Sequence, residues 1–384
     1  MYSKLLKERI DLKKRNQIFN YLYALAIIMV IDDHTNSRFG IMTSVFPYNS
    51  FYMPLFVFCS GYFYKQEGLV VNLKHKIKKL LLPYLLWNLC ACILALDLDA
   101  LLGLGWFVIP TLENVILSLF GFLPTSLNGA AWFVNMLFWV SILYNGSRII
   151  VKINKRDDLL MTVLFFLLGI LSTLLCVIDY WKHGVWAVFA LKILFYVQFY
   201  HYGYMFRRYG EEWLKKYNRL FVCCLCILVN IILITIYGTD IEFPSTTRMS
   251  EFDSWYLPII TSTTGIVFYY ELTSFLAEKI GPHRIIDFIS RNTFVIMQVH
   301  LLFTNIPNFV VYSMIRNGSD KFADFNIVSF MYSAWYRYNK ESQFIGFFCG
   351  VAGSLLVAYI LEKIRAFFKL YIKEKREQVT KSHP

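Results

Sequence analysis

Ten apolar runs, each long enough to cross the hydrocarbon core of a bilayer, constrain this chain more than any other feature of its sequence. A hydrophobic fraction of 57% and a mean hydropathy of +0.48 exceed what a soluble domain carries. We therefore predict an all-α, polytopic integral membrane protein with about ten transmembrane helices. The runs lie near residues 17–34, 45–64, 80–97, 130–150, 159–179, 185–206, 220–238, 255–277, 288–315 and 344–368.

The lysines and arginines between these runs predict the orientation of the chain. Six segments that would share one side of the membrane hold thirty of them: 1–16, 65–79, 148–156, 207–219, 279–291 and the tail from residue 363. The five alternate segments hold seven: 35–50, 97–131, 179–185, 238–255 and 316–343. The positive-inside rule places both termini in the cytoplasm. It also accounts for the net charge of +12, so we expect no nucleic-acid partner.

The domain organisation predicted from this pattern is simple. We expect a basic cytoplasmic tail over residues 1–16, one transmembrane domain over 17–368 and a charged cytoplasmic tail over 369–384. No repeat of 20–50 residues or low-complexity linker interrupts the domain. Residues 101–124 are apolar but broken by glycine and proline, which favours a re-entrant or interfacial piece over an eleventh span. No cleavage site follows the first run, so we expect it to remain as a signal anchor.

The eight cysteines all lie inside apolar segments and are typical of small core residues. Cys223 and Cys226 have CxxC spacing, but neither histidine nor an acidic residue accompanies them. We expect no metal and no resident cofactor.

The first apolar run ends in a cluster of titratable residues. It is polar only at Asn20 and two tyrosine hydroxyls before Asp32, Asp33 and His34 arrive together, toward the outer face. Such a histidine is either an interfacial residue or a general base, and a neighbouring carboxylate favours the base because it orients the imidazole. Sequence neighbours on a helix point about 100° apart, so the orienting group could also come from elsewhere. We take His34 and Asp33 as candidate catalytic residues.

Other polar residues within the runs could line a cavity. His300 fits either a structural hydrogen bond or the site, and Gln198 and His201 fit a hydrophilic cavity. Trp132 fits either an aromatic residue at the membrane interface or a ring on which a sugar stacks. Ser60, beside Gly61, allows close approach of another helix.

A basic stretch, Lys74–Lys79, precedes the third run. Four lysines in six residues at a membrane surface commonly serve topology and bind anionic lipid. They would equally suit a ligand that carries several phosphates.

Several short motifs occur in an order that resembles a known family. They are His34 at the end of the first run, MPLFVFCSGYF (53–63), LLLPY (80–84) after the basic stretch, AAWFVNMLF (130–138), FYHYGYMFRR (199–208) and SRNTFVIMQVH (290–300). Over nearly the whole chain this resembles the acyltransferase family 3 membrane enzymes, in the branch of fucose 4-O-acetylases and other surface-polysaccharide O-acyltransferases.

The resemblance implies transfer of an acyl group, usually acetyl, from acyl-CoA to a hydroxyl of a cell-surface or lipid-linked saccharide. His34 matches the family's histidine and would act as general base. Lys76 and Lys79 stand where the family commonly has an Arg-x-x-Arg pair, so they would bind the donor, with Arg15 nearby. Tyr23 stands where many members carry arginine, and Asn20 where many carry aspartate.

The same resemblance implies location in the bacterial plasma membrane, with acyl-CoA as cosubstrate. Because the nucleotide would bind at the cytoplasmic face, its pantetheine arm would have to pass between helices to reach His34. Two rival functions fit the same helices. One is a transporter or flippase for a lipid-linked saccharide. The other is a membrane scaffold or sensor without enzymatic activity.

Overall fold

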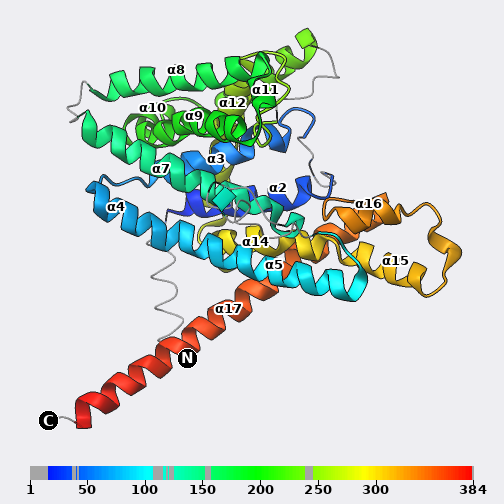
Figure 1. Ribbon diagram of the computed structural model, residues 1–384. Coiled ribbons are helices and arrows are strands. Elements are labelled where there is room, and N and C mark those ends of the chain that lie inside the picture. Colours follow the sequence, from blue (N-terminus) through cyan, green and yellow to red (C-terminus); the bar gives the residue numbers. More distant parts are fainter. Residues whose placement is uncertain are drawn as a thin grey trace.

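The computed structural model describes residues 16–36, 40, 43–106, 116–117, 120, 125–151, 157–237 and 245–382 (Figure 1). Every regular element of this part is helical, which confirms the all-α class. Each predicted apolar run carries a long helix: α2 (Gln17–Asp33), α3 (Tyr48–Tyr62), α5 (Leu82–Leu102), α7 (Trp132–Ile150), α8 (Asp157–Val177), α9 (Val185–Met205), α11 (Arg219–Tyr237), α12 (Leu257–Ile280), α14 (Thr293–Thr304) continued by α15 (Ile306–Arg316), and α17 (Lys340–Ser382).

Six helical segments of the described part are long and apolar enough, on those two criteria alone, to cross a membrane. They include α5 with its preceding helix, α7, α8, α11, α14 with α15, and α17. The protein is therefore an integral membrane protein, while the count of ten spans and the side of the termini stay predictions. The proposed re-entrant piece, 101–124, lies largely outside the described residues.

Shorter elements connect the long helices. They are α4 (Leu69–Lys76), a π-helical turn at Ile77–Leu81, 3-10 turns at Ser126–Ala131, Tyr180–His183 and Asp320–Phe322, a second π-helical turn at Phe206–Gly210, α10 (Glu211–Leu214), α13 (Arg284–Arg291) and α16 (Ile327–Tyr332). Because α4 leads into α5 without a break in helical structure, the basic stretch forms the start of one long rod (Figure 1).

The helices divide into a perimeter and a centre. Only 17% of the apolar window in Leu69–Leu102 is buried within the protein, against 67% in Thr293–Arg316. Lipid tails solvate exposed leucine and phenylalanine as well as a core does, so the perimeter helices stay apolar on the outside. At the centre, α3 and α2 are almost wholly buried, and both contact α12 and each other.

Two glycines let α3 and α9 cross at van der Waals distance. A Cβ at Gly61 would lie 1.8 Å from the carbonyl oxygen of Tyr200, and a Cβ at Gly203 would lie 1.9 Å from that of Phe58. Each glycine therefore accommodates the backbone of the other helix. The close approach predicted at Gly61 is confirmed. Gly61-Tyr62 at the end of α3 and Gly203-Tyr204 at the end of α9 form the two sides of this crossing.

Helix α2 is anchored at the end where it begins. The side chain of Asn16 caps it by accepting a bond from the Phe19 amide (3.5 Å). The hydroxyl of Tyr21 donates to the carbonyl of Gly281 (2.9 Å), and the Asn20 amide lies 3.5 Å from Asp287. These contacts fix the helix against α12 and α13, so its far end, which carries His34, is held in a defined position.

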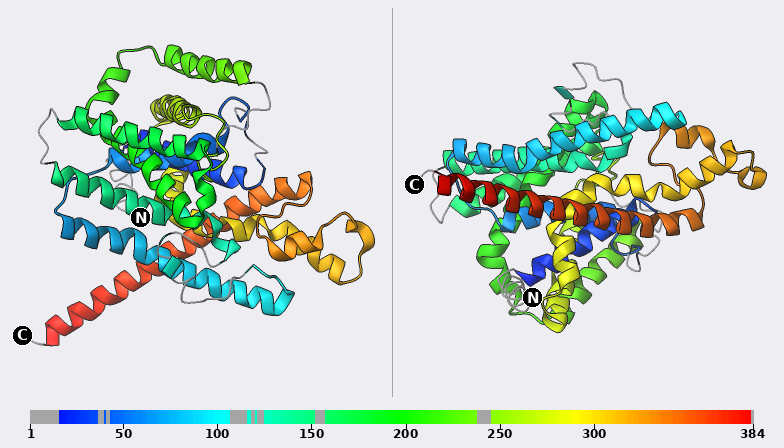
Figure 2. Two further views of the ribbon diagram at one scale, coloured as in Figure 1. Left: turned by 45° about the horizontal axis from the view of Figure 1, so that its top comes forward. Right: turned by 90° about the horizontal axis from the view of Figure 1, so that it is seen from below.

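Helix α17 has 43 residues and is about 65 Å long. Its C-terminal part extends past the other helices (red in Figures 1 and 2). The sequence predicts a change from span to tail near residue 368, and the helix continues through it to Ser382, since residues 354–382 contain neither glycine nor proline.

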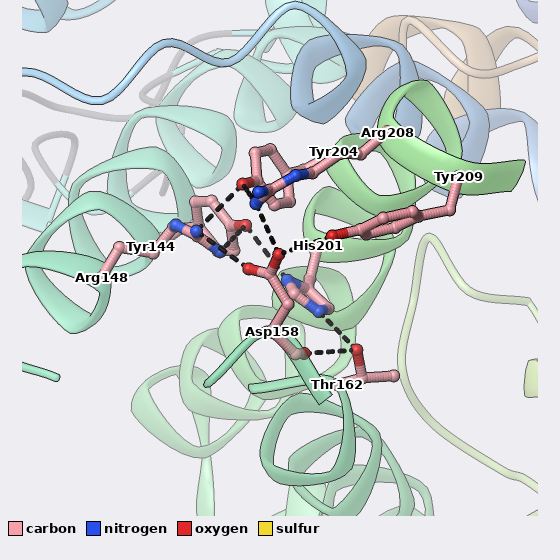
Figure 3. Close-up of polar contacts among 8 residues, drawn as sticks. All are labelled: Tyr144, Arg148, Asp158, Thr162, His201, Tyr204, Arg208 and Tyr209. Atoms are coloured by element: carbon pink, nitrogen blue, oxygen red, sulfur yellow. Dashed lines mark hydrogen bonds and ion pairs between the residues drawn. The ribbon is translucent and has the colours of Figure 1, made fainter. Parts of the chain in front are cut away.

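A buried polar cluster joins α7, α8, α9 and the π-helical turn that follows α9 (Figure 3). Arg148 donates to Asp158 (3.0 Å), and Arg208 donates to the other oxygen of the same carboxylate (2.5 Å). Both Arg148 and Asp158 are 3% exposed. The hydroxyl of Tyr204 lies within hydrogen-bond distance of both arginines, and His201 completes the cluster. The carboxylate balances charge that the low-dielectric interior could not otherwise hold.

We expect Asp158→Asn to lower the free energy of unfolding by roughly 3–5 kcal/mol, because Arg148 would remain charged and buried without a carboxylate. Denaturant titration of the purified protein in detergent measures this. The control is Asp179→Asn, whose partner Lys182 lies 2.5 Å away with both side chains half-exposed, and which should cost about 0–1 kcal/mol. Equal effects of the two substitutions would show that the buried Asp158 contributes no more to stability than the exposed Asp179.

Candidate functional site

Helix α2 ends at Asp33, and the candidate base His34 is the residue that follows. The amide of His34 still donates to the carbonyl of Val30 (3.2 Å), and the Thr35 hydroxyl bonds back to Ile31 (3.2 Å). These bonds cap the last turn and hold His34 at its C-terminal boundary. The residue is partly exposed, whereas Thr35 is buried.

The imidazole of His34 pairs with that of His300 from α14. His34 Nδ1 lies 2.6 Å from His300 Nε2, and the rings are nearly parallel at 8° with centroids 4.9 Å apart. His300 Nδ1 in turn lies 3.1 Å from the carbonyl oxygen of Ile296. A carbonyl only accepts, so His300 Nδ1 carries a proton and its Nε2, in the neutral ring, accepts from His34 Nδ1.

This order of donors fixes the tautomer of His34. Because its Nδ1 donates to His300, the lone pair of neutral His34 lies on Nε2. Nε2 has no hydrogen-bond partner within the described part of the chain. The arrangement leaves one basic nitrogen available to accept a proton from a ligand.

Arg337, in the segment before α17, holds the backbone of His34. Its Nε donates to the His34 carbonyl at 2.6 Å. The two terminal nitrogens donate to the side chains of Asn305 (3.2 Å) and Thr304 (3.1 Å) and to the carbonyls of Ala334 and Tyr336. The planar fork thus ties the end of α2 to the junction of α14 and α15.

The carboxylates next to His34 point elsewhere. Asp33 accepts from the hydroxyl of Tyr52 on α3 (3.0 Å), and Asp32 is buried and bonds Tyr48. The expectation that Asp33 orients the imidazole is therefore corrected, since that partner is His300. Adjacent residues on a helix face different neighbours, which is the physical reason.

A cavity of about 600 Å³ opens at His34. The indole of Trp335 meets the His34 ring edge-on, with centroids 4.9 Å apart, and packs on Gly129, where a Cβ would lie 2.3 Å from it. The wall mixes charged, amide, hydroxyl and aromatic groups. It consists of Asp33, His34, Asn36, Asn49, Tyr52, Met53, Gly129, Ala130, Trp132, Ser245, Thr247, Arg248 and Trp335.

A second, smaller cavity of about 150 Å³ lies deeper in the bundle. Its wall is apolar apart from the hydroxyls of Tyr23, Ser60 and Thr293, and the Ser60 hydroxyl donates to the carbonyl of Phe56 (2.9 Å). It is lined by Tyr23, Ile27, Phe56, Ser60, Leu80, Phe133, Val134, Leu137, Thr293, Phe294 and Met297.

The two cavities follow the same helices. On α3, Met53 lines the outer cavity and Phe56 the inner one, a separation of about 4.5 Å along the helix. On α7, Trp132 lines the outer cavity and its neighbour Phe133 the inner one. Residues close together on α3 and on α7 therefore line the two cavities.

The candidate donor residues lie at the opposite end of the bundle from His34. Lys76 ends α4, and Lys79 follows in the π-helical turn, one residue before Leu80 of the inner cavity. Nearby, the hydrogen bond from His75 holds the pKa of the Glu67 carboxyl below its usual range, so this end also carries one negative charge. Arg15 lies outside the described residues.

Two predicted cavity residues are corrected. Gln198 is fully buried against α8, where a Cβ at Gly169 would lie 2.3 Å from its amide, and His201 bonds Tyr144 and Thr162. Neither lines the cavities at His34 or Ser60. Both satisfy helix contacts instead, as buried polar groups in lipid must.

Comparison with known proteins identifies the family. A model of an acyltransferase domain matches residues 16–363. The chain belongs to acyltransferase family 3. This makes the protein a membrane acyltransferase, as the ordered motifs predicted, and weighs against the transporter and scaffold alternatives. Neither the curated proteins nor the solved structures include a match to it.

The sequence did not predict two residues that contact His34. Arg337 and Trp335 follow α16 and lie some 300 residues from His34 in sequence. In the sequence they look like an ordinary loop charge and an interfacial aromatic. Segment 316–343 did give a weak indication of these residues, because it holds four of the seven basic residues in the segments predicted on the outer side.

We expect Arg337→Lys to lower kcat of acyl transfer on the order of 10- to 100-fold with little change in the donor KM, since lysine keeps the charge but cannot hold the His34 backbone. Steady-state kinetics measure it. Arg316→Lys, an exposed arginine at the end of α15, is the control and should behave as the parent protein. An unchanged kcat for Arg337→Lys would remove this role.

Proposed function

We propose that this membrane acyltransferase transfers an acyl group, most simply acetyl, from acyl-CoA to a hydroxyl of a cell-surface or lipid-linked saccharide. The observation that carries the proposal is the chain of hydrogen bonds from Ile296 through His300 to His34. It supports His34 as general base because it leaves Nε2 basic at the wall of a cavity.

In the proposed reaction, the hydroxyl of the acceptor gives its proton to His34 Nε2 while its oxygen bonds to the thioester carbonyl carbon. Collapse of the tetrahedral intermediate breaks the carbon–sulfur bond, and the CoA thiolate takes the proton from His34. No covalent enzyme intermediate and no resident cofactor is needed. His300 accepts from His34 Nδ1 throughout and keeps the ring oriented.

Arg337 supplies a positive charge close to the reacting groups. All of its hydrogen bonds in the described part go to neutral oxygens, so no carboxylate cancels that charge. Negative charge builds on the carbonyl oxygen in the transition state, and a fixed positive charge in a low-dielectric site favours it.

For the donor, we propose a path from the opposite end of the bundle. Lys76 and Lys79, with Arg15, would hold the phosphates of CoA at the cytoplasmic face. The pantetheine arm would pass through the inner cavity, where the hydroxyls of Tyr23 and Ser60 suit its amides. The alignment of the two cavities on α3 and α7 supports this path.

The remaining assignments follow from this path. We place the acyltransferase in the bacterial plasma membrane with both tails cytoplasmic, so that the saccharide is modified on the envelope side. The transmembrane domain would span residues 17–368, with α17 extending into the cytoplasm. The fucose 4-O-acetylase-like branch rests on the ordered motifs in the sequence.

We expect His34→Ala to lower acyl transfer by roughly 10²–10⁴-fold without changing acyl-CoA affinity, because it removes the base and leaves the donor path intact. Transfer from radiolabelled acetyl-CoA to saccharide, together with donor binding, measures both. His183→Ala, an exposed histidine between α8 and α9, is the control. Full activity of His34→Ala would exclude the base.

We expect Ser60→Phe to block transfer by filling the inner cavity of about 150 Å³. The matched control is Val267→Phe, which enters an apolar cavity of about 380 Å³ between α3, α9 and α12. Thermal stability of both variants shows whether they fold, and Ser60→Val serves if phenylalanine disrupts the bundle. A folded Ser60→Phe variant with normal turnover would refute the path.

A further inference from the structure

Four arginines in the described part of the chain, away from His34, pair with carboxylates. Each of them lies within about 3 Å of an aspartate or glutamate oxygen. The pairs are Arg148–Asp158 (3.0 Å), Arg208–Asp158 (2.5 Å), Arg219–Glu271 (3.1 Å) and Arg291–Asp287 (2.9 Å). Pairing with a carboxylate is the usual way in which a protein holds a partly buried charge.

Three basic side chains around the His34 cavity have partners other than carboxylates or face the cavity. Arg337 bonds neutral oxygens only, Arg248 lines the cavity wall, and Lys192 contacts the indole of Trp132. Within the described residues none of the three forms an ion pair with a carboxylate. Arg248 is exposed at the cavity, so its guanidinium is available to a ligand.

Lys192 is unusual in position as well as in pairing. It is the one lysine or arginine among 38 that lies in neither set of loop segments. It stands seven residues into α9, about 10 Å along the helix axis. Its ammonium is 3.6 Å from the centroid of the Trp132 ring, and that ring lines the cavity. One indole therefore separates the charge from the cavity.

The negative groups nearby do not balance these charges. Asp33 accepts from Tyr52, and Asp32 is buried beside Tyr48. Two carboxylates thus accompany three basic side chains, of which Arg248 lines the cavity together with Asp33, while Arg337 and Lys192 stand behind its wall. A polar cavity with surplus positive charge and low-dielectric walls attracts an anion. The phosphates of the proposed donor lie at the opposite end, so they do not supply it.

We propose that the acceptor is an anionic saccharide, one that carries a carboxylate or phosphate, with Arg248 contacting the anion and Lys192 attracting it from behind Trp132. This rests on the proposed function of the His34 cavity as the acceptor site. Asn49, Ser245 and Thr247 on the same wall offer hydrogen bonds to sugar hydroxyls. The anionic group would thereby fix which hydroxyl faces His34.

The test is binding, which needs no acyl transfer. Glucose, glucuronate and glucose 6-phosphate are titrated against the purified full-length protein by calorimetry. We expect the anionic sugars to bind at least ten-fold more tightly than glucose, and the better of the two identifies carboxylate or phosphate. In the double variant Arg248→Gln with Lys192→Met, the ratio of the affinity for the anionic sugar to the affinity for glucose should fall toward one. The control is Lys182→Met. It removes a positive charge from the same end of the protein, but one that is paired with Asp179.

Each outcome decides the proposal. Equal binding of glucose and both anions, or no binding of any, would overturn it, as would an anionic preference that the double variant retains. Binding of the anions with the expected preference supports it even if acetyl-CoA labels no sugar, in which case the transferase assignment alone fails.

Discussion

The hydrogen bond between His34 and His300 is the contact on which the site depends. It joins the first long helix to α14 across 266 residues of sequence, and it decides which nitrogen of His34 is basic. The backbone groups beside a bond of this kind also need hydrogen-bond partners, because lipid supplies none. Arg337 meets that need by holding the His34 carbonyl, and the Ile296 carbonyl meets it for His300.

The rest of the bundle serves to position this pair. Helix α2 is buried, apolar on all sides and anchored at its beginning, so it carries His34 without freedom to rotate. The glycine crossing of α3 and α9 brings α3 close to the centre, where its side chains line both cavities. The perimeter helices contribute an apolar surface to lipid and little to the site.

The sequence predicted what depends on local pattern. Apolar runs predicted the helices, and the glycine at residue 61 predicted a close crossing. The histidine at the end of the first run was predicted as a candidate base, and the structure places it at a cavity. Contacts between distant segments could not be predicted. Nothing local pairs His34 with His300, and Arg337 resembles any other loop arginine. Gln198 and His201 were misplaced because a sequence gives the depth of a residue in a helix but not the face that it presents.

We propose that a donor from one side of the membrane meets an acceptor from the other side at His34. Proteoliposomes with the protein in one known orientation test it directly. Labelled acetyl-CoA is placed on the side where α2 begins and an impermeant acidic saccharide on the side of His34. We expect labelled saccharide in this arrangement and none when the two substrates are exchanged. Labelled product formed only when both substrates share one side would contradict it.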